Sequence, residues 1–414
     1  MQFPPVLIIG GGVSGVTCGI VLQLLGIPTR IVCRHWLGER GTSRCDPRFA
    51  SMYPAASIIP HTVNIADEVW HMRCAQTFFG LLADTGIPGL RRQRHFEVFE
   101  SPRRMPAYAA EMPEFSIIQP DEQSDLVLRR CHDRPVFGWS FKTLFAEMPA
   151  YRSFLASMYV RVGGSIHSAA VITSESLRQF SEETVLNCSG AWSHLLFQDS
   201  QESRFVKGIL LRADLGGSLP VHRHTGELTS YNYHPDPSVY AQPDGTSADV
   251  YFYPRTDACL LGGARLQSPP LTADDVGAVG PEGEKPWMGD EYSKETIMIP
   301  SADAPGTFHA VPRPILDLNA QLIFQLTGVN VRDYPLSGMV GYRHQRQQVR
   351  IESQTIDSRR VIHNYGHGGA GVTLSWSCAI KVAQMVATSM GLEEITDAVS
   401  GRLKAHIAGG IGSL

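Results

Sequence analysis

The chain has 414 residues, which exceeds the length at which one hydrophobic core usually stops growing and therefore predicts about two domains. Hydrophobic residues make up 43% and charged residues 18% of the chain, a balance that excludes a disordered protein. The formal net charge of -4 excludes the broad basic surface that a nucleic-acid partner requires. The eight cysteines form no C-x-x-C pair and no window is apolar enough to span a membrane, so we expect a soluble protein of the reducing cytoplasm.

The N-terminal sequence predicts a strand, a glycine-rich turn and a helix. An apolar run over 6–9 stops at the G-x-G-x-x-G segment 10–15, and apolar residues then recur at helical spacing until Gly26. A second apolar run at 30–33 has the spacing of the next strand of a βαβ unit. This order is typical of a dinucleotide-binding unit, although a G-x-G-x-x-G segment is weak evidence by itself.

Each glycine of this motif has a physical role. Gly10 permits the tight turn, Gly12 lets the backbone approach a pyrophosphate, and Gly15 lets the helix pack against the strand. The next strand should end in an acid that binds the ribose, but this chain has Arg34 and His35 there. Because an arginine at this place could bind the 2′-phosphate of NADP, the unit alone leaves nicotinamide and flavin cofactors open.

The rest of the chain alternates between helical and strand patterns. Helices are expected at about 65–82, from about 141 to 162, at 315–326 and at 373–390. Strands are expected at 169–171, 184–188, 208–212, 250–253, 258–261 and 343–351. Two segments rich in Pro, Gly, Asp and Ser, about 214–248 and about 267–308, are predicted to be long loops of the kind that often cover active sites.

Several segments together resemble the D-amino acid oxidase family of FAD-dependent oxidases. The strongest is 363–376, HNYGHGGAGVTLSW, which is similar to the C-terminal signature H-N-Y-G-H-G-G-x-G-x-T-x-x-W of that family. The others are GYRHQRQQVR at 341–350, YFYPR at 251–255, LGG at 261–263 and NCSGAW at 187–192. Microbial members often carry A-R-[DE] where this chain has Cys33-Arg34-His35, so the resemblance favours flavin over NADP.

The resemblance implies an α/β fold with two domains. A discontinuous, Rossmann-like FAD-binding domain would comprise 1–72, 148–200 and 330–414. A substrate domain of α+β type, built on a mixed and largely antiparallel sheet, would comprise 73–147 and 201–329.

The resemblance also implies the site residues. Arg346 would clamp the substrate carboxylate with Tyr251 as a second donor, and the Gly369 carbonyl would accept from the substrate amine. An arginine outside such a motif is usually a solvated surface charge, and a strand tyrosine is usually a half-buried packing residue. The residues implied to bind FAD are Gly10, Gly12, Val13, Ser14, Gly15, Arg34, Ala50, Ser51, Val171, Ser189, Gly190, Gly368, Gly369, Ala370, Gly371, Val372 and Thr373.

Other polar residues receive plainer interpretations. His367 is expected to hold the glycine-rich loop by hydrogen bonding rather than to act in catalysis. Cys188 and Cys378 are expected to be packing residues. No metal site is predicted, because the histidines at 222, 224 and 234 have no carboxylate or cysteine at ligand spacing.

Two departures from the family pattern border the expected pocket. His344 replaces a proline, and Ala370 replaces a residue that is often bulky. We expect Ala370 to widen the cavity and the loop that carries Tyr231, Tyr233, His234 and Tyr240 to cover it. Both features predict a substrate larger than alanine.

The function implied by the resemblance is oxidation of a D-amino acid to an imino acid and then a 2-oxo acid. Hydride would pass to flavin N5 and molecular oxygen would reoxidise the flavin to give hydrogen peroxide. A related amine or imino-acid oxidase or dehydrogenase that tailors an unusual amino acid remains an alternative, as does a non-catalytic flavin-binding regulator. The expected partners are an amino-acid substrate, oxygen and a second copy of the chain in a homodimer.

Overall fold

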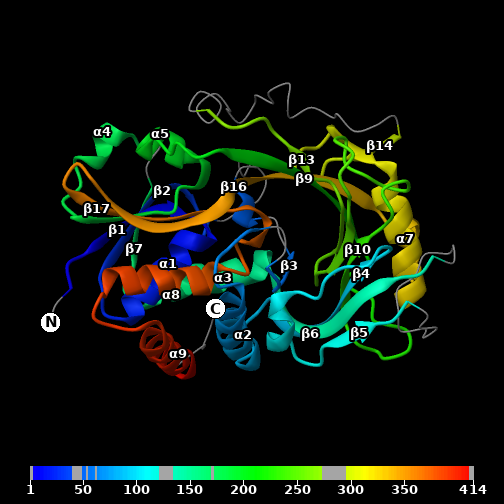
Figure 1. The fold of residues 1–414 in the computed structure, drawn as a ribbon, viewed down its shortest axis with the longest axis horizontal. Coiled ribbons are helices and arrows are strands. Elements are labelled where there is room, and N and C mark those ends of the chain that lie inside the picture. Colours follow the sequence, from blue (N-terminus) through cyan, green and yellow to red (C-terminus); the bar gives the residue numbers. More distant parts are fainter. Residues whose placement is uncertain are drawn as a thin grey trace.

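A computed structural model describes residues 3–39, 49–52, 55–60, 63–120, 134–168, 172–272 and 295–409. The expected strand at 169–171, and with it the predicted FAD ligand Val171, lies outside these residues. Helices cover both ends of one large mixed sheet (Figure 1). This architecture confirms the predicted α/β class and its mixed, largely antiparallel part.

One end of the sheet is parallel. Its strands, in spatial order, are β17 (Arg359–His367), β8 (Thr184–Asn187), β1 (Val6–Gly11), β2 (Thr29–Trp36) and β7 (Ser165–Ser168). The apolar run 6–9 is almost completely buried because both faces of β1 are covered. The helices α1 (Val13–Leu24), α3 (Met148–Arg161) and α8 (Ser375–Val386) lie on one face, and Leu177 and Leu196 pack on the other. The predicted βαβ unit is therefore present.

The other end of the sheet is mostly antiparallel. Its strands are β3 (Ala55–Ser57), β4 (Leu90–Phe99), β5 (Ser116–Ile118), β6 (Phe137–Glu147), β9 (Ser203–Ala213), β10 (Thr229–His234), β11 (Val250–Pro254), β12 (Cys259–Gly262) and β13 (Leu266–Gln267). A second core lies between one face of these strands and α7 (Arg313–Thr327). The strands β14 (Thr296–Pro300) and β15 (Phe308–Pro312) pair separately.

The longest strand, β16 (Leu336–Ile356), connects the two ends of the sheet. It pairs with β9 over 336–346 and with β17 over 345–356, both antiparallel. One continuous strand therefore links the antiparallel end of the sheet to β17 and to the glycine-rich segment at the end of β17.

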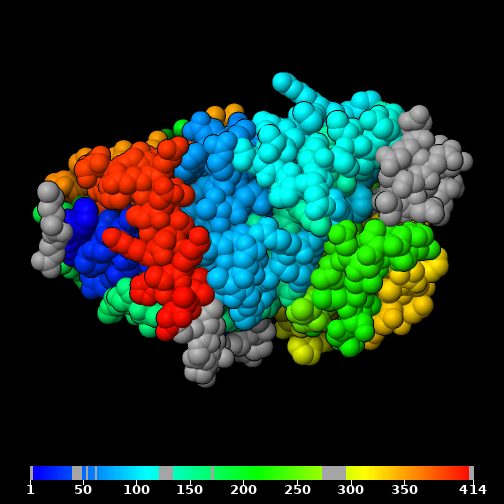
Figure 2. Space-filling view, turned by 90° about the horizontal axis from the view of Figure 1, so that it is seen from below, coloured from blue at the N-terminus to red at the C-terminus, as the bar shows by residue number. Residues whose placement is uncertain are grey.

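Further helices lie at the edges. They are α2 (Glu68–Asp84), α4 (Ser174–Leu177), α5 (Ser193–Phe197) and α9 (Leu392–Ala408), with short 3-10 turns η1 (Ala50–Met52), η2 (Ala107–Glu111), η3 (Gly190–Trp192), η5 (Val331–Asp333) and η6 (Gly368–Ala370). The helix α9 packs against α1, α2 and α8, and Figure 2 shows it in red on the outer surface. None of the described helices is long and apolar enough to cross a membrane.

The structure corrects several predicted elements. Residues 141–147 belong to β6 and α3 begins only at Met148, because 141–146 pair with β4 and Glu147 pairs with Ala55 of β3. The strands β10 and β14 lie within the two segments that were expected to be loops, and α9 was not expected. The division of the chain into FAD-binding and substrate domains stays a prediction.

Candidate cofactor and substrate site

A cavity of about 370 Å³ lies where the parallel strands β1, β2 and β8 end. Carboxyl ends of parallel strands are the usual place for a nucleotide in open α/β sheets. Among the described residues, Arg34 and Arg343 are the arginines that line it, and no aspartate or glutamate does. The cavity therefore suits anionic groups.

The glycine-rich turn fits a pyrophosphate. Gly10 has a φ of +112°, and a Cβ there would lie 2.4 Å from the Cys188 carbonyl oxygen, so only glycine is tolerated. A Cβ on Gly15 would lie 2.0 Å from the Gly10 carbonyl oxygen, which explains the close contact of helix and strand. Gly12 caps α1 and lines the cavity with Val13 and Ser14, so the positive end of the helix borders the cavity, where the Val13 amide donates to the Ser51 hydroxyl at 3.1 Å.

The second glycine-rich segment forms the opposite wall. Gly366 and Gly368 have φ values of +83° and +51°, which turn the chain from β17 into η6. His367 supports this turn, because its Nε2 lies 3.0 Å from Asn364 Oδ1. Burial lowers the pKa of His367 to about 4, so the ring is neutral at neutral pH.

Arg343 and Tyr251 meet on one face of the antiparallel sheet. Arg343 lines the cavity, and its Nη2 donates to the Tyr251 hydroxyl at 3.5 Å. Two glycines leave the space for these side chains. A Cβ on Gly208 would lie 2.7 Å from the Arg343 guanidinium, and one on Gly262 would lie 1.9 Å from the Tyr251 ring.

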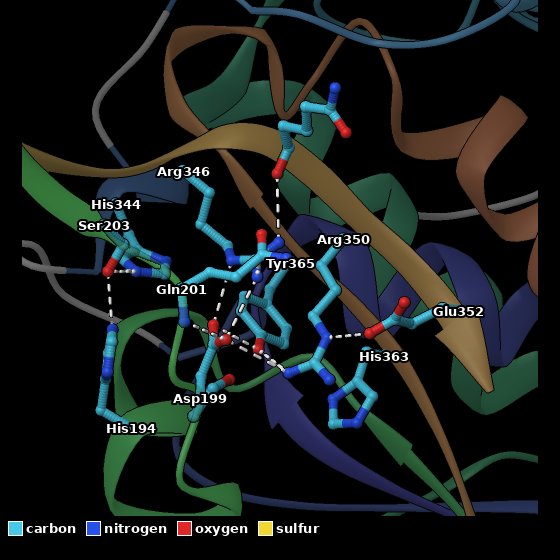
Figure 3. Close-up of polar contacts among 12 residues, drawn as sticks. His194, Asp199, Gln201, Ser203, His344, Arg346, Arg350, Glu352, His363 and Tyr365 are labelled. Carbon is cyan, nitrogen blue, oxygen red and sulfur yellow. Dashed lines mark hydrogen bonds and ion pairs between the residues drawn. The ribbon is translucent and has the colours of Figure 1, made fainter. Parts of the chain in front are cut away.

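Arg346, which the sequence assigned to the substrate carboxylate, is not among the residues that line the cavity. Its Nε and Nη2 lie 3.0 and 3.1 Å from the two carboxylate oxygens of Asp199, and Nη2 also donates to Gln201 Oε1 at 2.9 Å. Figure 3 shows the guanidinium enclosed by these partners. The guanidinium is therefore already paired with a buried carboxylate.

The other predicted site residues divide into two groups. Those that line the cavity are Gly10, Gly12, Val13, Ser14, Arg34, Ala50, Ser51, Ser189, Gly190, Gly368, Gly369, Gly371 and Val372. Gly15, Tyr251, Ala370 and Thr373 do not line it. Gly15 packs on Gly10, and Thr373 Oγ1 donates to the Ile59 carbonyl at 3.1 Å.

The structure contradicts both expectations on which the prediction of a large substrate was based, namely that Ala370 widens the cavity and that a tyrosine-rich loop covers it. Ala370 packs with Leu374 and Cys378 instead of facing the cavity. Tyr231 and Tyr233 point from β10 into the second core, and the Tyr240 hydroxyl donates to the Gly263 carbonyl at 2.9 Å. These tyrosines are core residues rather than a cover.

Sequence reasoning missed Arg343 and the surroundings of Arg346. Both arginines stand in the same segment, but their partners on β9 are Val206 and Ser203, which lie on opposite faces of the sheet. The alternation of a strand could have separated the two arginines. It could not have shown which face borders the cavity.

These features define the class of the protein as a dinucleotide-binding α/β fold whose sheet continues into a mostly antiparallel part. Residues 5–385 match the family described as FAD dependent oxidoreductase (DAO). The chain is 26% identical over 393 residues to a D-amino-acid oxidase of Rubrobacter xylanophilus, and the aligned region covers 93% of this chain and 96% of the relative. It is 25% identical to a D-amino-acid oxidase of Streptomyces coelicolor, with 92% and 96% covered.

Among solved structures, iminodiacetate oxidase from Chelativorans sp. BNC1 has a similar fold. The TM-score is 0.58 at 15% identity, with 93% of this chain and 96% of that chain covered. The match over nearly the whole chain places this protein in the DAO family of FAD-dependent oxidoreductases. It is an enzyme of the kind that acts on amino acids, and its cofactor is FAD.

The cavity fits this cofactor. The amides at the start of α1 would hold the pyrophosphate, Arg34 would lie at the adenosine end, and the segment 366–372 would border the isoalloxazine. When bound, the flavin supplies the acceptor for a hydride.

Proposed function

We propose that the protein oxidatively deaminates a D-amino acid to an imino acid, which hydrolyses to the 2-oxo acid, with hydride transfer to flavin N5. Oxygen would then reoxidise the flavin and yield hydrogen peroxide. The observation that carries this proposal is the pairing of Arg343 with Tyr251 at the wall of the cofactor cavity. The sequences of the D-amino-acid oxidases that resemble this chain support it.

Arg343 takes the role of carboxylate clamp in this proposal. Its guanidinium is half-buried, borders the cavity and has no carboxylate partner among the ion pairs of the described residues. A planar guanidinium binds a carboxylate through two parallel hydrogen bonds and so fixes orientation as well as charge. The Tyr251 hydroxyl, which accepts from Arg343, can donate its own proton to the same carboxylate.

The amine is held from the other side of the site. The carbonyl of Gly369, in the cavity wall, would accept from the amino group. The two contacts together would fix the substrate at its α-carbon, which hydride transfer requires because the reacting atoms must be close and aligned.

Two histidines of the cavity wall, His344 and His367, do not take up a proton at neutral pH. Burial lowers the pKa of His344 to about 3 and that of His367 to about 4. Both rings are therefore neutral and weakly basic. The substrate amine would react in its neutral form after losing its proton to water.

A second candidate is oxidation of an amine or imino acid. The fold of iminodiacetate oxidase is similar, and the compound in that enzyme's name is a secondary amine with carboxylate groups. An Arg343 clamp would serve such a substrate equally well, so the nature of the amine distinguishes the two candidates.

The test is anaerobic reduction of the purified holoenzyme, followed by the flavin absorbance. A panel would contain D- and L-amino acids, glycine and N-carboxymethyl amino acids. Bleaching by D-amino acids alone, and return of the colour with peroxide after air is admitted, is the expected result. Bleaching by secondary amines only would favour the second candidate. Reduction of the flavin by L-amino acids would contradict the proposed preference for D-amino acids. Slow return of the flavin absorbance after air is admitted would exclude oxygen as the electron acceptor.

A further inference from the structure

Asp199, Arg346 and Arg350 form a buried ionic cluster beside the cofactor cavity (Figure 3). Arg346 lies 3.0 Å from the Asp199 carboxylate and Arg350 lies 3.5 Å from it. The Tyr365 hydroxyl donates to Asp199 at 2.7 Å and accepts from Arg350 Nη1 at 2.7 Å. The cluster thus joins β16, β17 and the segment after α5.

The cluster lies directly behind the glycine-rich wall of the cavity. A Cβ on Gly366 would lie 2.8 Å from the Arg346 Cγ and Cδ atoms, so the arginine stem packs against the Gly366 backbone. The Arg346 guanidinium also lies 5.5 Å from the centre of the Tyr365 ring. Tyr365 and Gly366 both line the cavity. One layer of protein therefore separates the Arg346 stem from the cofactor space.

The cluster has a surplus of one positive charge. The two arginines carry two positive charges and Asp199 carries one negative charge. Burial would raise the pKa of Asp199, but the Tyr365 hydrogen bond and the Arg346 charge outweigh burial and lower it, so the carboxylate is ionised. Glu352 also pairs with Arg350, but its side chain is 57% exposed, so water screens its charge.

The other titratable groups facing the cluster are neutral. Burial raises the pKa of Tyr365 to about 12. Burial also lowers the pKa of His344 to about 3, lowers that of His363 to about 4 and lowers that of His194. These groups therefore leave the surplus charge of the cluster unchanged at neutral pH.

We propose that this cluster is an electrostatic device that raises the reduction potential of the bound FAD, with Arg346 as the main cation and Asp199 as the residue that positions and partly offsets it. The inference rests on FAD occupying the cavity, as in the proposed function. Hydride transfer adds two electrons and one proton to the flavin and leaves the ring with one additional negative charge. A fixed cation in a poorly solvated site stabilises that charge without having to move.

The test uses two substitutions that change the charge in opposite directions. Asp199→Asn removes the negative charge, and Arg346→Met removes a positive charge while keeping an unbranched stem. The readouts are the two-electron midpoint potential of the bound flavin and the dissociation constant of sulfite, which adds to flavin N5 and places a negative charge on the ring. Asp199→Asn should raise the midpoint potential and lower the dissociation constant of sulfite. Arg346→Met should lower the midpoint potential and raise the dissociation constant of sulfite. We expect each dissociation constant to change by about tenfold.

Two further variants separate charge from folding. Arg346→Lys keeps the charge but loses the planar fork, so it should retain a potential close to that of the wild type. Arg30→Gln is the matched control, because Arg30 pairs with the buried Glu182 at the amino end of β2, away from the cavity. It should leave the potential and the sulfite constant unchanged. If Asp199→Asn does not fold with FAD, Arg350→Gln replaces it and should act in the same direction as Arg346→Met.

A merely structural cluster would give a different pattern. Shifts of the same sign in Asp199→Asn and Arg346→Met, or unchanged potentials in both, would overturn the proposal. Neither readout needs an amino-acid substrate. A wild type that binds FAD but is not reduced by amino acids would therefore refute the proposed function and still allow this inference to be judged.

Discussion

Single glycines decide where the candidate substrate-binding side chains lie. Gly208 stands on β9 opposite Gly341, and the Arg343 side chain crosses above it. Because Gly208 has an ordinary φ, alanine is tolerated by the backbone there, and its Cβ would meet the end of a flexible side chain. The position therefore offers a mild way to displace Arg343.

We predict that Gly208→Ala raises the KM for the amino acid by about tenfold, because the carboxylate loses well-placed charge-assisted hydrogen bonds. The dissociation constant of FAD should stay the same. Steady-state kinetics and apoprotein titration with FAD measure the two quantities. An unchanged KM would show that the Arg343 guanidinium does not hold the substrate.

Tyr251 and Tyr253 form a matched pair on β11. Their rings lie 5.0 Å apart, but the Tyr253 hydroxyl donates to Asn232 Oδ1 instead of meeting Arg343. Tyr251→Phe should raise KM about three- to tenfold through the loss of one hydrogen bond, whereas Tyr253→Phe should lower the unfolding free energy and leave KM unchanged. Equal effects of the two substitutions on KM would count against a role for the Tyr251 hydroxyl.

At the scale of single residues, the glycine-rich turn could be recognised in the sequence, whereas the surroundings of Arg343 and Arg346 could not. The turn around Gly10 and Gly15 has a geometry that any dinucleotide fold shares, so its pattern is readable in the sequence. The choice between Arg343 and Arg346 depends on the register of β16 with β9 and on the partner Asp199, which is far away in the chain. No local pattern contains that information.

At the scale of elements, α9 carries an apolar face that the sequence analysis did not use. Ile395, Val399, Leu403 and Ile407 follow one another every four residues and are all buried. This spacing was sufficient to predict the helix. The strand β10, in contrast, lies in a segment rich in turn-forming residues, and only its packing against β4 and β11 makes it a strand.

We predict that Leu403→Ala lowers the unfolding free energy by about 2–5 kcal/mol, because it removes a fully buried side chain of α9, which packs against α1, α2 and α8. Lys404→Ala, at the neighbouring exposed position, should change it by less than about 0.5 kcal/mol. Denaturant unfolding of both variants as holoenzymes checks this. Similar values for the two would mean that α9 contributes little to the fold.

At the scale of the whole molecule, buried neutral histidines make the fold sensitive to acid. Burial lowers the pKa of His71 and His344 to about 3 and that of His363 and His367 to about 4. An unfolded histidine takes up a proton near pH 6.5, so between about pH 6.5 and pH 4 the unfolded state binds more protons than the folded state.

The unfolding free energy should therefore fall as the pH drops through this window, by at most about 1.4 kcal/mol per pH unit for each of these histidines. Denaturant titrations between pH 7.5 and pH 4.5 measure the slope. His71→Gln, which removes the buried histidine that contacts Ser377, should make the slope shallower. A free energy that is constant over this window would show that these rings are not buried as described.

The large sheet brings both halves of the site together through β16, which presents Arg343 to the cavity and Arg346 to Asp199. The most direct measurement compares Arg343→Met with Arg346→Met by anaerobic, rapid-mixing reduction of the flavin at increasing amino-acid concentration. The account predicts that Arg343→Met weakens the apparent Kd of the amino acid by about 10- to 100-fold, while Arg346→Met leaves that Kd within about threefold of the wild type. A large loss of affinity in Arg346→Met with a normal Kd in Arg343→Met would contradict the assignment of the carboxylate clamp.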